Sequence, residues 1–176
     1  MAKSGNGPLK IRTYGDPVLR EVSKPVAEIT PELRQLAQDM LATMYAADGV
    51  GLAAPQIGKS VRLVVIDIAK EESQRNPLVL FNPEVFPDDE SELSVCEEGC
   101  LSVPDLWAEV ARPNRVTFRA LDIDGQPVEM TVEGTLARAV QHETDHLDGR
   151  LFVDRIGPAE RAMLQSKLKK MARGRK

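Results

Sequence analysis

Apolar residues recur at helical spacing in three stretches of the chain. The first follows Thr30 and Pro31, residue types favoured at a helix N-cap and at the first helical position. The second covers about 135–148 and stops at Gly149, a residue type suited to a helix C-terminus. The third begins at Pro158 and is expected to turn four apolar side chains inward and its basic side chains outward. The four are Met163, Leu164, Leu168 and Met171.

Between the first two helices the pattern changes to that of β-strands. Residues 61–68 and 78–81 are rich in β-branched and large apolar residues, and from Trp107 onward apolar and polar residues alternate. The alternating runs on either side of the Asp-Gly pair at 124–125 predict a hairpin. This order predicts an α+β fold. We expect antiparallel sheets around the second helix, which is central, with an N-terminal helix and a basic C-terminal helix.

Composition places the chain among ordinary globular proteins. It has 176 residues, of which 42% are hydrophobic and 28% are charged. At roughly 100 to 200 residues per domain, this length predicts one domain over 1–176, large enough to fold without disulfides or a structural metal. The longest apolar runs are strand-sized, and none approaches the ~18 residues of a membrane-spanning helix. We therefore expect no membrane partner.

Charge is unevenly distributed along the chain. The net charge is −4, but residues 155–176 hold eight Lys or Arg and one acid, whereas residues 1–154 carry an excess of 11 acids. A basic cluster of this kind suits a polyanionic partner, because local charge rather than net charge sets such contacts. A solvated helix end is the alternative explanation for the same cluster.

Two cysteines are present, Cys96 and Cys100. In an extended segment their Cα atoms would lie about 13 Å apart, beyond the roughly 7 Å limit for a disulfide. The first eight residues contain neither an apolar stretch nor an Arg-rich amphipathic pattern, so we expect no targeting signal and a cytoplasmic location. Cys96 is expected to be a small buried hydrophobic residue.

His142 and His146 are the only histidines of the chain, and with Glu143 they form the pattern H-E-x-x-H. At about 100° per residue, the two imidazoles lie about 40° apart on one helix face, so both can reach one metal ion. Glu143 lies about 100° from His142, where it can exchange a proton with water without binding the metal. The pattern therefore predicts a metal site on the second helix.

The third ligand decides the class of metal enzyme. A metzincin has a histidine where this chain has Phe152, which excludes that class. A thermolysin-like glutamate on a following helix is also missing, because the corresponding region holds Ser166 and Glu160 is poorly spaced. Cys100 is the remaining soft ligand, and two imidazoles with one thiolate leave the open position of a catalytic site. The alternative is a closed structural site with Cys96 as its fourth ligand.

A glycine-rich segment, 49–58, follows the first helix. It lacks the spacing of a phosphate-binding loop, so no nucleotide site is expected. Its small residues predict a turn that packs tightly against the second helix. Gln56 is the one polar side chain of this segment, and its amide could either tether the backbone or donate a hydrogen bond to an oxyanion.

Three motifs together resemble the signature of the peptide deformylase family. They occur in the family's order and spacing, and the resemblance extends from 16–20 through the hairpin at 124–125, so it covers nearly the whole chain. The chain is similar to the bacterial and organellar type with few insertions. The motifs are Gly49-Val-Gly-Leu-Ala-Ala-Pro-Gln56, Glu98-Gly-Cys-Leu-Ser102 and Gln141-His-Glu-Thr-Asp-His-Leu-Asp-Gly149.

The resemblance implies removal of the N-formyl group from the N-terminal methionine of newly synthesised polypeptides, with release of formate. A divalent metal ion would be held by Cys100 and the two histidines. By similarity this ion is Fe(II), with Zn(II), Ni(II) or Co(II) as substitutes. Glu143 would act as general base and then as general acid. The oxyanion would be stabilised by the metal, the Gln56 amide and the backbone N–H of Leu101.

The same resemblance implies how partners bind. The methionine pocket would be apolar, with Arg138 near its lining, and the peptide backbone would pair along 50–51 as an added strand. The basic helix would dock on ribosomal RNA, and no DNA partner is expected. The residues implied to contact the substrate are Val50, Gly51, Glu98, Trp107 and Ala139.

Two other classes of protein fit parts of the pattern. A metallopeptidase would cleave internal peptide bonds, but it needs a third His or Glu ligand that the chain lacks. A catalytically silent relative, which only binds metal or the ribosome, would be expected to have lost Glu143 or Gln56. Both residues are present.

Overall fold

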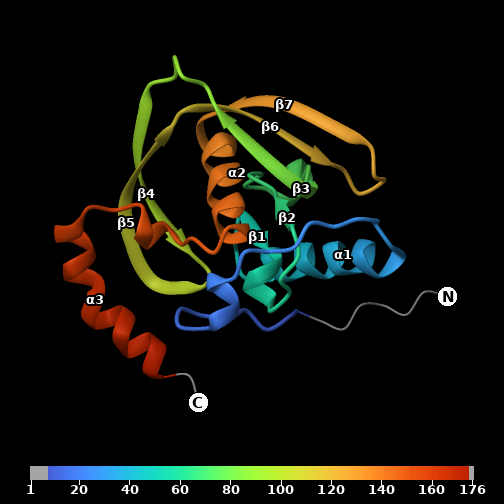
Figure 1. Ribbon diagram of the computed structural model, residues 1–176. Helices are drawn as coiled ribbons and strands as arrows, with labels where there is room; N and C mark the ends of the chain where they lie inside the picture. Colours follow the sequence, from blue (N-terminus) through green and yellow to red (C-terminus); the bar gives the residue numbers. More distant parts are fainter. Residues whose placement is uncertain (1–7, 175–176) are drawn as a thin grey trace.

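The computed structural model describes residues 8–174, which contain three α-helices and seven β-strands (Figure 1). The helices are α1 (Pro31–Ala46), α2 (Gly134–Leu147) and α3 (Pro158–Arg173). The strands are β1 (Gly51–Ala53), β2 (Leu63–Ile66), β3 (Leu78–Pro87), β4 (Leu93–Cys100), β5 (Val103–Pro113), β6 (Arg115–Leu121) and β7 (Pro127–Glu133). Residues 1–7 lie outside the described residues, and the expectation of no targeting signal rests mostly on them. Arg175 and Lys176 of the basic tail also lie outside the described residues.

Five strands form one antiparallel sheet in the order β1-β2-β3-β6-β7, and β4 and β5 form a separate two-stranded ribbon. Strand β2 is buried on both faces, because Val64 and Ile66 pack in the core that includes α2 while Leu63 and Val65 pack in the core that includes α1. Burial on both faces explains the continuous apolar run in the sequence. The hairpin predicted at 124–125 joins β6 to β7.

Helix α2 lies between the sheet and the ribbon and contacts strands of both (Figure 1). The predicted α+β architecture, with antiparallel sheets around this helix, is confirmed. The helix begins one residue before the predicted Thr135 and ends before Gly149, which has φ +71°. Helix α1 starts as predicted, since the Thr30 hydroxyl accepts a hydrogen bond from Leu33 N and Pro31 occupies the first turn.

The sequence pattern missed two strands, β1 and β4. Strand β1 lies inside the glycine-rich segment, and three residues are too few to display an alternation. Strand β4 is mostly exposed or half-buried, and its apolar residues do not alternate regularly with polar ones. The prediction that Cys96 is buried was wrong, because Cys96 is exposed. It lies on β4, whereas its pairing partner Val110 on β5 is fully buried.

Helix α3 packs against the ribbon and the segment 151–153 through Leu164, Leu168 and Met171. The prediction that Met163 also faces inward was wrong, because this side chain is 79% exposed. It precedes Leu164 by one residue and is therefore rotated by about 100° from the stripe that the other three form. Among residues 8–174, no helix is both long and apolar enough to span a bilayer.

Candidate metal centre and active site

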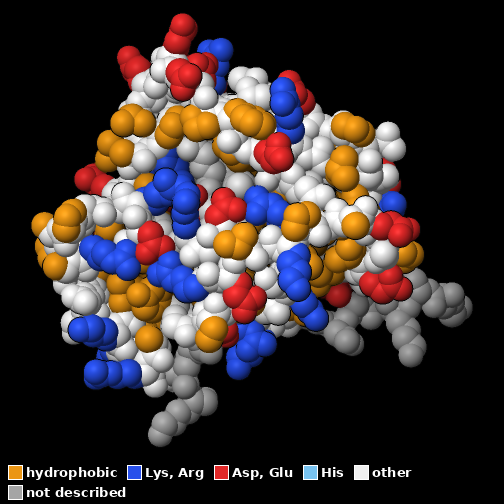
Figure 2. Space-filling model, viewed as in Figure 1, with side chains coloured by type: hydrophobic (Ala, Val, Ile, Leu, Met, Phe, Trp, Pro, Cys, Tyr) orange, Lys and Arg blue, Asp and Glu red, His pale blue; other side chains and the backbone are white. Residues whose placement is uncertain are grey.

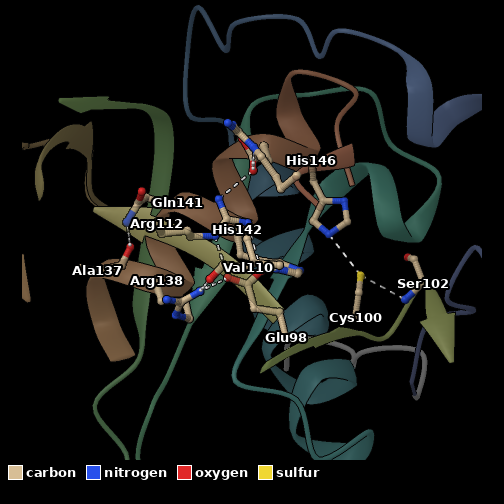
Figure 3. Close-up of polar contacts among 12 residues, drawn as sticks. Glu98, Cys100, Ser102, Val110, Arg112, Ala137, Arg138, Gln141, His142 and His146 are labelled. Carbon is tan, nitrogen blue, oxygen red and sulfur yellow. Dashed lines mark hydrogen bonds and ion pairs between the residues drawn. The ribbon is translucent and has the colours of Figure 1, made fainter. Parts of the chain in front are cut away.

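Cys100, His142 and His146 meet between the ribbon and α2 (Figure 3). Their ligand atoms lie within 4.8 Å of one another, and Cys100 Sγ is 3.3 Å from His146 Nε2. Cys100 is the last residue of β4, whereas both histidines lie on α2 with their ring centroids 5.1 Å apart. The structure therefore brings together the three predicted ligands. Cys96, the alternative fourth ligand, is not in the cluster found among the described residues.

The donor set of this cluster fits a transition-metal ion. One thiol and two imidazoles make a three-ligand set, which leaves a coordination position open and is typical of catalytic sites. His142 Nδ1 lies 2.9 Å from Glu98 Oε2. A carboxylate partner at Nδ1 leaves Nε2 as the ligand atom and fixes the orientation of the ring, an arrangement common around metal-binding histidines.

Glu98 lies next to His142 and is only 5% exposed (Figure 3). Arg112 donates to its two oxygens over 2.7 and 3.0 Å. Burial alone would raise the pKa of Glu98, but hydrogen bonds from His142 and Arg112 outweigh burial and hold this pKa well below its usual range. Glu98 borders the cavity, yet protein donors occupy both of its oxygens. Its contact with substrate stays a prediction.

Arg112 extends this network along α2 to Asp145. It is 4% exposed, and it also donates to Asp145 over 2.9 Å. Asp145 in turn accepts a hydrogen bond from Arg155 over 3.0 Å. The sequence did not predict this role of Arg112 and Asp145. One signal was available, because the alternation of β5 places Arg112 on the same inward face as Ala108 and Val110.

Glu143 is 4% exposed, and its carboxylate lies against the backbone of Gly51. A Cβ built on Gly51 would stand 2.3 Å from Glu143 Oε1, so only glycine leaves room for the carboxylate in this position. Burial raises the pKa of Glu143 to about 7, although the neighbouring His142 and Arg112 act in the opposite direction. Oε2 has no hydrogen-bond partner among the described residues. Glu143 is thus a buried carboxylate with a free oxygen beside the metal ligands.

Gln56 lies on a short 3-10 turn, Ala54–Ile57, that follows β1, and it is 1% exposed. Its Oε1 accepts a hydrogen bond from Ala53 N over 2.8 Å. Its Nε2 lies 3.5 Å from Cys100 Sγ and donates to the Ser102 hydroxyl over 3.2 Å. The amide oxygen therefore tethers the backbone, and the amide nitrogen points toward the candidate metal ligands. Gln56 can thus both tether the backbone and donate a hydrogen bond to an oxyanion. The backbone N of Ser102 also donates to Cys100 Sγ, a role of Ser102 that the sequence did not predict.

A cavity of about 500 Å³ opens in front of the metal ligands. At its rim, the Trp107 ring is 62% exposed and rests on Gly99, where a Cβ would stand 2.5 Å from the ring. Strand β1 is an edge strand of the sheet. Its neighbour Val50 is 50% exposed, so this edge is accessible from the cavity. The lining includes the remaining predicted residues, Val50, Gly51, Leu101, Trp107 and Ala139.

Comparison with known proteins identifies the family. Residues 8–162 match the family model described as "Polypeptide deformylase". "Peptide deformylase 2" of Gloeobacter violaceus is 53% identical over 154 residues, which are 88% of this chain and 82% of the relative. "Peptide deformylase" of Mesorhizobium japonicum is 53% identical over 158 residues, 90% of this chain and 89% of the relative. The crystal structure of a peptide deformylase from Legionella pneumophila aligns with a TM-score of 0.84 at 46% identity, over 97% of this chain and 99% of that one. The chain belongs to the polypeptide deformylase family.

Proposed function

We propose that this chain removes the N-formyl group from the N-terminal methionine of newly synthesised polypeptides and releases formate. Membership of the deformylase family makes it a metal-dependent hydrolase that acts on N-formylmethionyl peptides. The observation that carries the proposal for this chain is the position of Glu143. Its buried carboxylate lies next to a Cys100–His142–His146 cluster at the end of an apolar cavity.

A divalent ion bound by Cys100, His142 and His146 would polarise the formyl carbonyl and make water nucleophilic at neutral pH. Of the candidate ions we favour Fe(II) because of the family resemblance. Thiolate and imidazole suit several metals, so Zn(II), Ni(II) or Co(II) would serve as substitutes. Glu98 orients the His142 ring. Glu143 accepts the proton of the attacking water and then delivers it to the leaving amine.

Gln56 and the backbone N–H of Leu101 stabilise the oxyanion that forms on the formyl oxygen. Support comes from Gln56 Nε2, which is held near Cys100 Sγ by the hydrogen bond that Gln56 Oε1 accepts from the backbone. A donor fixed in this way costs no reorganisation during the reaction, which is the condition for strong oxyanion stabilisation.

Gln56→Leu is therefore expected to lower kcat by about 100-fold or more, because one oxyanion donor is lost. Metal content stays unchanged, since Gln56 is not a ligand. The check is steady-state deformylation of formyl-Met-Ala-Ser, with metal measured by atomic absorption on the same samples. Near-normal turnover of the leucine variant would refute the role of Gln56.

The peptide substrate binds along the edge of β1 with its methionine side chain in the cavity. Backbone pairing with Val50 and Gly51 adds the peptide to the sheet as a further strand. Trp107, Ala139 and Glu98 complete the surroundings of the first residue. Formylated nascent chains are made on ribosomes, so we place the enzyme in the cytoplasm.

The basic helix α3 docks on ribosomal RNA. Figure 2 shows Lys and Arg side chains gathered at the lower left of the molecule, where Figure 1 draws α3. Within the described residues this helix exposes Lys167, Lys169, Lys170 and Arg173. A polyanion attracts a cluster of this kind through the release of counterions, so the docking is salt-dependent.

Neutralising the cations of α3 is expected to weaken co-sedimentation with ribosomes and to reduce its dependence on salt. Deleting 166–176 is a blunter test, because it removes the buried Leu168 and exposes the core beneath the helix. A fourfold change to glutamine at Lys167, Lys169, Lys170 and Arg173 keeps that core.

The matched control neutralises four exposed cations of the body and changes net charge equally. Equal binding by the α3 variant and the control would discard the docking proposal. The four control positions are Lys10, Lys24, Lys59 and Lys70.

The proposed activity is tested by the release of free amine from formyl-Met-Ala-Ser. Protein loaded anaerobically with Fe(II) is compared with metal-free protein, and acetyl-Met-Ala-Ser is the control substrate. Release from the formyl peptide alone, and only with metal, is the expected result. A metal-loaded protein that leaves the formyl peptide intact would favour the silent relative, and cleavage of the internal peptide bonds would favour the metallopeptidase.

A further inference from the structure

The proposed metal ligands come from two separate parts of the fold, the β4-β5 ribbon and helix α2. Cys100 lies on the ribbon of β4 and β5, whereas His142 and His146 lie on α2. The ribbon is hydrogen-bonded to itself and not to the five-stranded sheet. The distance from the Cys100 thiol to the two imidazoles therefore depends on the side-chain contacts between the ribbon and α2.

Arg138 crosses from α2 to both strands of the ribbon (Figure 3). It lies one helical turn before His142. Its NH1 donates to Glu98 Oε1 over 2.6 Å and to Val110 O over 2.9 Å, and its NH2 donates to Ser94 O over 2.6 Å. Its side chain is 15% exposed. One guanidinium thus connects the helix to a side chain and a carbonyl of β4 and to a carbonyl of β5.

Other polar contacts between α2 and the ribbon do not replace this one. Gln141 donates to Pro113 O over 3.0 Å, and Asp145 accepts from Arg112, so both contacts end on β5. Within residues 8–174, the hydrogen bonds from α2 to β4 come from Arg138 and from the two ligand histidines themselves. Strand β4 is the one that carries Cys100.

Arg138 is not needed to balance the charge of Glu98. Arg112 already donates to both oxygens of that carboxylate and is 4% exposed, so Glu98 keeps a buried cationic partner without Arg138. What Arg138 adds is the forked connection to the two backbone carbonyls, a geometry that a guanidinium provides and an ammonium does not.

We propose that Arg138 is a positioning residue for the metal centre: by bracing β4 and β5 against α2, it sets the separation between Cys100 and the two histidines. The inference rests on the proposed three-ligand metal site. The functional consequence is slower metal loss, because a ligand set held at its bonding distance resists opening. Changes in residues that orient metal ligands typically cost 10- to 100-fold in metal affinity or activity.

The test uses the full chain loaded with Co(II), whose bond to a thiolate gives an absorption band that reports Cys100 directly. Excess EDTA is added, and the decay of this band is followed for the wild type, Arg138→Leu, Arg138→Lys and Arg62→Leu. Arg62 is the matched control. Its side chain is 17% exposed, and it donates to the Asp148 carboxylate over 2.8 Å and to Pro83 O over 3.2 Å. It therefore makes the same kinds of bond at similar burial, away from β4.

Arg138→Leu is expected to lose Co(II) about 10-fold faster than the wild type or more, and Arg62→Leu at about the wild-type rate. The melting temperatures of the metal-free proteins show whether the two leucine variants lose similar stability. Arg138→Lys is expected to lose Co(II) as fast as Arg138→Leu. If Arg138→Leu does not fold, the rate of Arg138→Lys tests the proposal.

Equal rates for Arg138→Leu and Arg62→Leu, or a wild-type rate for Arg138→Lys, would overturn the proposal. A wild-type protein without the thiolate band would instead contradict the proposed metal site itself. The two failures are therefore distinguishable.

Discussion

Glu143→Gln lowers kcat/KM for formyl-Met-Ala-Ser by about 10³-fold, within the range of 10²- to 10⁴-fold that a positioned general base contributes. Glutamine keeps the size of the side chain but cannot accept the proton of the attacking water. The Glu143 carboxylate is buried, and its Oε2 has no hydrogen-bond partner among the described residues, so this oxygen is available to accept that proton. A loss of this size corresponds to about 4 kcal/mol of transition-state stabilisation.

Measuring the metal content of Glu143→Gln shows whether the variant has lost only its general base or also its bound metal. Glu143 is outside the ligand cluster, so Glu143→Gln is expected to bind one metal per chain like the wild type. The control is Glu90→Gln, which removes the same charge from an exposed position outside the cavity lining and is expected to leave kcat/KM unchanged. A Glu143→Gln enzyme with wild-type turnover would remove Glu143 from the mechanism.

Gly51→Ala is expected to lower kcat by about 100-fold, because a misplacement of about 1 Å at a catalytic group has an effect of this order. The added Cβ would stand 2.3 Å from Glu143 Oε1 and must displace that carboxylate. Gly51 does not have a positive φ, so alanine fits the backbone. The obstacle is the Glu143 side chain from Cγ to the carboxylate and not a backbone atom, so the protein is expected to fold and bind metal with its base displaced.

Steady-state kinetics and the melting temperature together check the Gly51 prediction. Gly157→Ala is the control, since Gly157 has φ −66° and its Cβ would meet nothing within 4 Å. It is expected to leave both quantities unchanged. If Gly51→Ala unfolds the protein or leaves kcat at the wild-type value, the proposed contact between Gly51 and Glu143 does not control the base.

The parts of the fold that the sequence predicted are those with a long regular pattern. Helix α1 has both its N-cap and its stripe, and α2 displays H-E-x-x-H at the spacing that places both imidazoles on one face. These local rules do not depend on the rest of the molecule. The same spacing argument, with the elimination of other classes, led to Cys100 as the third ligand, and the structure brings its thiol to the histidines.

The parts that the sequence did not predict depend on contacts between distant segments. Strand β4 has no regular apolar alternation, because its buried residue, Glu98, faces Arg112, Arg138 and His142 rather than an apolar core. The exposure of Cys96 follows from the two-stranded ribbon, whose existence no local pattern indicated. That the chain is a single domain stays a prediction.

The most direct test of the account is a titration of the metal-free protein with Co(II), in which formate release from formyl-Met-Ala-Ser and the thiolate–cobalt absorption band are followed together. Both signals are expected to rise in proportion and to saturate at one metal ion per chain, and Cys100→Ala is expected to show neither. Formate release without the thiolate band, or full activity of the metal-free protein, would contradict a reaction centred on Cys100, His142 and His146.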